Sequence, residues 1–177
     1  MESTTQSTLD IRVTGYGHPD AQHLSAEVQQ EYVRRYGEGD ETVMHPDDFE
    51  PPAGLFLIAY LDGVPVASGG WRAKKAGPHG VRDGDAELKR MFVVSAARGR
   101  GLARALLRRL EETAAEAGHT RVILETGTEQ PEAISLYTSE GYADVEKFGL
   151  YRESPLSVCM GKPLPAVPPL PAAQPHS

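Results

Sequence analysis

The sequence predicts an α+β fold built on a mixed central β-sheet, with antiparallel strands first, one parallel pair later, and flanking helices. Two observations lead to this class. Two apolar runs flank the dipeptide Asp62-Gly63, a pattern typical of an antiparallel hairpin. An amphipathic segment over residues 101–117 lies between two further apolar runs. A helix that connects two strands in this way makes them parallel neighbours.

The first elements are a strand and a helix. Residues 9–13 alternate apolar and polar side chains, which predicts a strand. Asp20 is a suitable N-cap for a helix that runs to about Tyr36, and Gly37 ends it. The segment 38–52 that follows is rich in carboxylates and proline and shows no periodicity. It is either a substrate-facing loop that attracts an amine or a solvated acidic loop.

The hairpin comprises predicted strands over 54–61 and 64–72. Pro65 lacks an N–H group, so its place near the start of the second strand predicts an edge position. Gly69-Gly70 within that strand predicts a bulge or a close approach of backbone. Residues 73–84 form a connection rich in glycine, lysine and histidine.

The central strand is expected over 85–94, and the helix after it ends at Gly118. A short apolar strand follows over 121–125, and Pro131 suits the first turn of another helix that runs to about Glu140. Two last strands are expected over 142–146 and 156–161. These boundaries predict one domain over residues 9–162, between a mobile N-terminus (1–8) and a disordered proline-rich tail (163–177).

Composition narrows the functional classes. The 177 residues carry a net charge of −7, which argues against nonspecific binding to nucleic acid or to a membrane surface. Cys159 is the only cysteine, so no internal disulfide and no cysteine-based metal site can form, and no other spacing suggests a metal. The N-terminus lacks a signal-peptide pattern and no apolar run is long enough to span a bilayer. We expect a cytoplasmic protein.

A glycine-rich basic turn separates the central strand from its helix. Gly99 and Gly101 allow a ligand to approach the backbone, and the following helix directs its first N–H groups and its positive dipole end at the turn. Arg98, Arg100 and Arg104 add positive charge. The third glycine of a dinucleotide fingerprint is absent, as is a Walker A motif. The turn therefore predicts an anion site of another kind, suited to a pyrophosphate.

Two motifs identify a family. The segment Arg98-Gly-Arg-Gly101-Leu-Ala103 resembles motif A of the GNAT superfamily of N-acetyltransferases, whose acetyl-CoA signature is R/Q-x-x-G-x-G/A. Residues 133–142, A-I-S-L-Y-x-x-x-G-Y, resemble motif B of the same superfamily, in the expected order and spacing. The resemblance covers about residues 87–143 and implies the GNAT fold.

The resemblance implies an acetyl-CoA site between two strands that diverge, over 88–94 and 121–125. Backbone groups of the turn would hold the pyrophosphate, and those of three residues on the central strand would hold the pantetheine arm and polarise the thioester. Many members carry Asn where this chain has Gln130, whose amide can substitute for it. The implied acetyl-CoA contacts are Met91, Phe92, Val93, Arg98, Gly99, Arg100, Gly101, Leu102, Ala103, Gln130 and Tyr137.

The resemblance also implies direct acetyl transfer to an amine. Tyr137 occupies the superfamily's usual position for the acid that protonates the departing thiolate. Either Glu87 on the central strand or Glu125 at the end of the neighbouring strand is a candidate general base, and both alternatives stay open. Cys159 lies in a short apolar strand, where a cysteine is usually a buried hydrophobe and not a nucleophile.

The function expected from these features is acetylation of a small-molecule primary amine with acetyl-CoA as co-substrate and no metal. Two alternatives remain: acetylation of a protein or peptide amine, and a non-catalytic acyl-CoA-binding module. The fold supports too many acceptors for resemblance to choose among them. A homodimer through the late strands around 142–162 is a further possibility.

Overall fold

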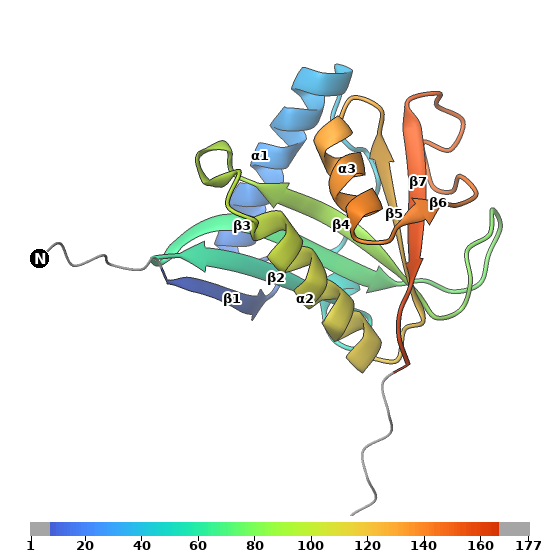
Figure 1. Ribbon diagram of the computed structural model, residues 1–177, viewed down its shortest axis with the longest axis horizontal. Coiled ribbons are helices and arrows are strands. Elements are labelled where there is room, and N and C mark those ends of the chain that lie inside the picture. Colours follow the sequence, from blue (N-terminus) through green and yellow to red (C-terminus); the bar gives the residue numbers. More distant parts are fainter. Residues whose placement is uncertain (1–7, 167–177) are drawn as a thin grey trace, which may run out of the picture.

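The computed structural model describes residues 8–166, and its centre is a twisted seven-stranded sheet with the strand order β1-β2-β3-β4-β5-β7-β6 (Figure 1). All neighbours are antiparallel except β4 and β5, which are parallel. This is the predicted mixed sheet with one parallel pair. The strands are β1 (Leu9–Thr14), β2 (Gly54–Leu61), β3 (Val64–Ala73), β4 (Asp85–Val93), β5 (Arg121–Gly127), β6 (Ala143–Asp144) and β7 (Ser157–Pro163).

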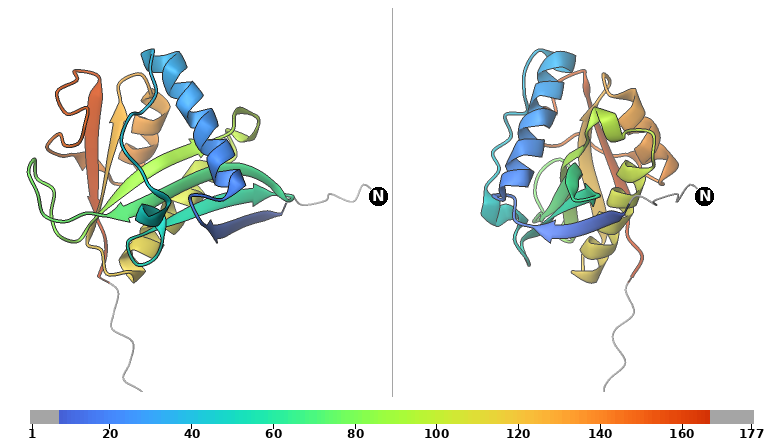
Figure 2. Two further views of the ribbon diagram at one scale, coloured as in Figure 1. Left: turned by 180° about the vertical axis from the view of Figure 1, so that it is seen from behind. Right: turned by 90° about the vertical axis from the view of Figure 1, so that its left-hand side faces the viewer.

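Helices cover both faces of the sheet. The helix α1 (Pro19–Tyr36) lies on one face, and α2 (Leu102–Glu116) and α3 (Pro131–Ser139) lie on the other (Figure 2). Two short 3₁₀ turns, η1 (Pro46–Phe49) and η2 (Ser95–Ala97), precede β2 and α2. Within residues 8–166, no helix is long and apolar enough to cross a membrane.

Each face has its own apolar core. The predicted apolar stripe of α2, including Leu106, Leu107 and Leu110, is fully buried against the sheet. On the other face, Leu24 of α1 packs with an aromatic cluster that includes Phe49 of η1 and Phe56 of β2. Burial of this much apolar surface is the main stabilising contribution, and Phe49 anchors the acidic segment 38–52 to the sheet.

The prediction that β3 is an edge strand is wrong. β3 pairs with β2 on one side and β4 on the other. Pro65 is tolerated there because the register shifts between Ala59 and Tyr60 opposite it, so the ladder is already interrupted at this point. The predicted bulge at Gly69-Gly70 is confirmed by a second register shift. A Cβ atom at Gly70 would lie 2.6 Å from the ring of Phe56, which explains the glycine.

The parallel strands β4 and β5 separate after a short paired stretch. Their register extends only from Asp85 opposite Arg121 to Glu87 opposite Ile123. Beyond it, Arg90 of β4 adopts a left-handed backbone conformation with φ of 58°, at the point where the β3–β4 register shifts. This bulge changes the direction of β4. The backbone groups that follow Glu87 on β4 and Ile123 on β5 therefore do not pair with each other.

The end of the chain differs slightly from expectation. β6 has two residues instead of the predicted five, and β7 continues to Pro163, after which Leu164 N–H bonds to the Thr120 carbonyl at 2.8 Å. The backbone N–H of Thr8 bonds to Asp62 Oδ1 at 2.8 Å. The other residues of the predicted mobile N-terminus (1–7) and most of the proline-rich tail (167–177) lie outside the described residues.

Candidate active site

A cavity of about 200 Å³ opens where β4 and β5 separate. Its walls come from α1, the segment after it, the bulged part of β4, the end of β5, the start of α3 and the loop before β7. Four residues predicted from the sequence line it together: Met91, Glu125, Gln130 and Tyr137. Its other lining side chains include Tyr32, Tyr36, Glu38, Asp40, Lys89, Arg90, Tyr151, Ser154 and Ser157.

The glycine turn follows β4 after the short turn η2 and is shaped for an anion. Gly99 and Gly101 have φ of 79° and 74°, a conformation that favours glycine over any L-residue. Gly101 is the N-cap of α2, and no side chain caps the helix end. The helical hydrogen bonds begin with Ala105 N–H to the Gly101 carbonyl at 3.1 Å. The N–H groups of Leu102, Ala103 and Arg104 thus precede the first intrahelical bond and are available to a pyrophosphate.

The charge near the turn is smaller than a count of arginines suggests. Arg104 and Arg108 both pair with Glu140 at the end of α3, so neither is a free cation at the turn. Arg98 turns back toward the strand, where its Nε donates to the Val93 carbonyl at 3.0 Å. Arg98 Nη2 also lies 4.0 Å from Glu31 Oε1, whereas Arg100 is exposed and makes no ion pair within residues 8–166.

One of the three residues predicted to bind pantetheine through its backbone, Val93, already has protein partners. Val93 pairs with Ala67 of β3, and its carbonyl is the acceptor for Arg98. Met91 lines the cavity, whereas Phe92 and Val93 do not. The bulged part of β4 still lacks a partner strand on its β5 side. This free edge fits an extended ligand that hydrogen-bonds as an added strand does.

Tyr137 lies inside the cavity wall on α3. Only 6% of the residue is exposed, and its ring packs edge-on against Tyr142 with 5.5 Å between the centroids. Burial raises the pKa of the Tyr137 phenol, with the neighbouring Tyr32 adding to the effect. The hydroxyl therefore keeps its proton throughout the neutral range and can donate it.

Glu125 lies near the end of β5 and lines the same cavity. Ser157 Oγ donates to Glu125 Oε2 at 3.2 Å, and Cys159 Sγ lies 3.8 Å from the same oxygen. Burial raises the pKa of the Glu125 carboxyl; Lys89 opposes this effect, while Asp40 and Glu87 reinforce it. A partly buried carboxylate with a raised pKa is a better proton acceptor at neutral pH than an ordinary glutamate.

Glu87, the other predicted base, has a different environment. Its side chain is buried and accepts a hydrogen bond from Arg72 Nε at 2.8 Å, with Lys74 Nζ 3.9 Å away. It does not line the cavity. The structure thus separates the two carboxylates: Glu125 faces the cavity, and Glu87 forms a buried ion pair beside it.

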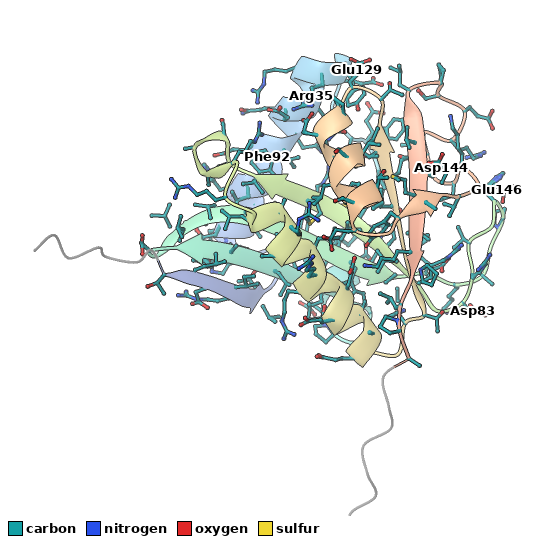
Figure 3. All side chains as sticks on the ribbon, viewed as in Figure 1. Arg35, Asp83, Phe92, Glu129, Asp144 and Glu146 are labelled. Carbon is teal, nitrogen blue, oxygen red and sulfur yellow. The ribbon has the colours of Figure 1, made fainter. Side chains whose placement is uncertain are left out.

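Gln130 is the N-cap residue of α3, and its Oε1 accepts a hydrogen bond from Tyr36 at 3.1 Å. Arg35 binds the same region, because its Nη1 donates to the Glu129 carbonyl at 2.8 Å (Figure 3). These two bonds attach the end of α1 to the loop between β5 and α3. They fix this rim of the cavity. The side-chain amide of Gln130, predicted to contact acetyl-CoA, is thus also held by Tyr36.

Four residues that line the cavity, Tyr32, Lys89, Arg90 and Tyr151, were not predicted as site residues, and Asp40 was predicted only as part of the acidic segment. Asp40 belongs to the acidic segment, and its position supports the substrate-facing interpretation of that segment's first part. The rest of the segment is different, because η1 packs Phe49 into the core and Asp48 lies 3.6 Å from Arg72. For Arg90 no sequence signal was available, since a bulge at a non-glycine residue does not alter the residue pattern.

Cys159 is buried on β7, and burial raises the pKa of its thiol, as expected for a structural cysteine. In the described part of the chain, no group of three or more histidine, cysteine or acidic side chains gathers as a metal ion would require.

Comparisons with known proteins show the family of this chain. A family model described as "Acetyltransferase (GNAT) family" matches residues 23–142. The chain is 42% identical over 109 residues to an IAA acetyltransferase of Azospirillum brasilense, covering 62% of this chain and 67% of that one. It is 36% identical to the N-acetylaspartate synthetase of Homo sapiens, covering 58% of this chain but 34% of that protein.

Among solved structures, a putative acyl-CoA N-acyltransferase from Klebsiella pneumoniae is 28% identical, with a TM-score of 0.69 and coverage of 90% of this chain and 98% of that one. A putative acetyltransferase from Salmonella typhimurium, solved with its cofactor acetyl-CoA, shares the fold at 17% identity, with a TM-score of 0.65 and coverage of 94% and 99%. The two motifs, the diverging parallel strands and the family match together establish that this chain belongs to the GNAT family of acetyltransferases.

Proposed function

We propose that this protein transfers the acetyl group of acetyl-CoA to the primary amine of a small molecule. The observation that carries the proposal is the pairing of Glu125 and Tyr137 in one cavity. One is a carboxyl whose pKa is raised, and the other is a phenol that stays protonated. A base and an acid in one cavity are what acetyl transfer to an amine requires.

The steps balance with these two groups alone. Glu125 accepts a proton from the acceptor's ammonium group, directly or through one water. The freed nitrogen lone pair attacks the thioester carbonyl carbon, and a C–N bond forms as the C–S bond breaks. Tyr137 donates its proton to the departing sulfur and regains one from the nitrogen, which loses its second proton as the amide forms, and Glu125 then releases its proton to solvent. The products are an acetamide and coenzyme A, and no covalent acetyl-enzyme is formed.

The co-substrate fits along β4 and the glycine turn. The turn residues Arg98, Gly99, Arg100, Gly101, Leu102 and Ala103 would hold the pyrophosphate. The free edge of β4 near Met91 would hold the pantetheine, with Phe92 and Val93 supporting the strand, and Gln130 would contact it from the other side. Backbone N–H groups placed in this way would polarise the thioester carbonyl.

A small acceptor is favoured over a peptide by the size and walls of the cavity. Its volume of about 200 Å³ is below that of typical drug-sized pockets. The loop before β7 is also joined to the acidic segment beside the cavity, because Tyr151 Oη accepts a hydrogen bond from Glu41 N–H at 2.7 Å. The names of the two relatives above, which refer to IAA and to N-acetylaspartate, support a small-molecule acceptor.

The test measures thiol release from acetyl-CoA with a panel of amines, and CoA binding by calorimetry, for the wild type and Tyr137→Phe. We expect release with at least one small amine and a loss of rate in the variant with no loss of CoA affinity. Tight CoA binding with no release for any amine would favour a non-catalytic module instead. Release with peptides only would favour a peptide acetyltransferase.

A further inference from the structure

Two cations are buried in the cavity wall on β4, and one of them, Arg90, has fewer hydrogen-bond partners than its guanidinium can bind. Lys89 and Arg90 are neighbours on the bulged part of β4, and their side chains are 10% and 4% exposed. Both line the cavity. Buried cations of this kind are found where an anion or a set of hydrogen-bond acceptors accompanies them.

Asp40 is the anion that both cations share. Its Oδ2 accepts from Lys89 Nζ at 3.1 Å and from Arg90 Nη1 at 3.2 Å. Its Oδ1 is already occupied by the Thr42 N–H at 2.9 Å. Lys89, Arg90 and Thr42 together hold the pKa of Asp40 below its usual value despite burial, so Asp40 is charged at neutral pH. Lys89, Arg90 and Asp40 together thus carry one net positive charge.

The donors of Arg90 exceed its partners. A guanidinium has five N–H groups in a planar fork that matches a carboxylate. Within residues 8–166, Asp40 is its only carboxylate partner, the Tyr32 hydroxyl is a further side-chain partner, and the buried Nε has no hydrogen-bond partner. A buried donor without an acceptor costs free energy, so a second anion bound by the same guanidinium would offset part of the cost of burying Arg90.

We propose that the acceptor is a primary amine that also carries a carboxylate, and that Arg90 and Lys89 bind this carboxylate. The inference rests on the proposed function, because it assigns the acceptor of the same reaction. Glu125 and the β4 cations border one cavity. The amine of an amino acid faces Glu125 while its carboxylate faces Arg90. A neutral or purely cationic amine would leave Arg90 with Asp40 as its one carboxylate partner among the described residues.

The competing explanation is that Lys89 and Arg90 only anchor Asp40 and the segment around it. In that case an acceptor's carboxylate would bring no advantage. The two explanations differ in acceptor preference, which stability measurements alone do not report.

The experiment compares matched acceptors with the wild-type protein. Phenylalanine is compared with phenylalaninamide and 2-phenylethylamine, and lysine with 1,5-diaminopentane, by thiol release from acetyl-CoA. We expect kcat/KM to be at least about tenfold higher for the carboxylate-bearing member of a pair, as one charge-assisted hydrogen bond would give. Equal or higher rates for the amines without a carboxylate would overturn the inference while leaving the proposed function intact. No release from any of these compounds or from the wider amine panel would overturn both.

Variants test whether the β4 cations cause the preference for a carboxylate-bearing amine. Arg90→Met should reduce the carboxylate preference to near unity by raising KM for the amino acid, with little change for its amine. Arg109→Met removes one positive charge from the exposed side of α2, where Arg109 pairs with Glu112, and should keep the preference. Lys89→Met replaces Arg90→Met if thermal unfolding shows that the latter is not folded. A full preference in a folded Arg90→Met or Lys89→Met protein would contradict the assignment.

Discussion

The two sides of the cleft are built by different means. The glycine turn is contiguous in sequence, uses backbone N–H groups, and depends on the conformations of Gly99 and Gly101. The acceptor side takes single side chains from separate elements, such as Asp40 after α1, Arg90 on β4 and Glu125 on β5. A backbone site can be identified from a local motif, whereas a side-chain site exists only once the topology brings its parts together. We therefore expect substitutions of the side chains to affect the reaction of the amine, and substitutions in the glycine turn to affect CoA binding.

The largest expected effect is on the acceptor side. Glu125→Gln keeps the size and hydrogen-bonding capacity of the side chain but cannot accept a proton. We expect kcat/KM for the best amine to fall by about 10³-fold at neutral pH, within the usual range for a general base. CoA affinity, measured by calorimetry, should not change. A rate within a few-fold of wild type would remove Glu125 from the mechanism.

The same variant should not lose stability at neutral pH. Because burial raises the folded-state pKa of Glu125, its ionised form opposes folding. The associated stability is present below the ordinary pKa of a glutamate and is lost as pH rises through the raised value. At pH 7 to 8, Glu125→Gln should therefore unfold at the same urea concentration as wild type or at a higher one. A lower midpoint would show that the ionised carboxylate stabilises the fold.

Tyr137→Phe should have the next largest effect. The phenyl ring keeps the contact with Tyr142, and the proton donor is lost. We expect kcat to fall by about 10²-fold, at the lower end of general acid catalysis. With an activated thioester whose thiolate leaves without protonation, the deficit should shrink. A deficit that is the same for both thioesters would contradict the role of Tyr137 as the acid.

On the other side of the cleft, Gly101→Ala should weaken CoA binding by about tenfold, which corresponds to ~1.4 kcal/mol. Its φ of 74° strains an L-residue by roughly 1–2 kcal/mol and misdirects the N–H groups of the turn. Gly118→Ala is a matched control at the opposite end of the helix, with φ of 91° and, as at Gly101, no neighbour that a Cβ would meet. Both variants should lose similar stability, and only Gly101→Ala should lose CoA affinity.

The smallest effect on catalysis is expected for Glu87→Gln. Glu87 is paired with Arg72 outside the cavity, so the acetylation rate should stay near that of wild type. Stability should fall by about 1–3 kcal/mol in urea unfolding, because Arg72 loses a buried anionic partner. A large loss of rate in a stable protein would transfer the base role to Glu87.

Much of the fold could be predicted from the sequence, because its signals are local. The Asp62-Gly63 turn, the apolar stripe of α2 and the two GNAT motifs each lie within a short segment. The position of β3 was mistaken because Pro65 alone does not reveal that the register opposite it is interrupted. The bulge at Arg90 and the position of Asp40 depend on contacts between distant segments. For the same reason, a choice between Glu87 and Glu125 needed the structure, since both lie on neighbouring strands.

The most direct test is the pH dependence of the rate deficit of Glu125→Gln. A base that removes a proton from the acceptor's ammonium group becomes dispensable when the solution itself supplies the free amine. We therefore expect the ratio of wild-type to variant kcat/KM to be largest near neutral pH and to shrink steadily as pH rises toward the pKa of the acceptor. A ratio that stays constant across this range would show that Glu125 does not act as the base.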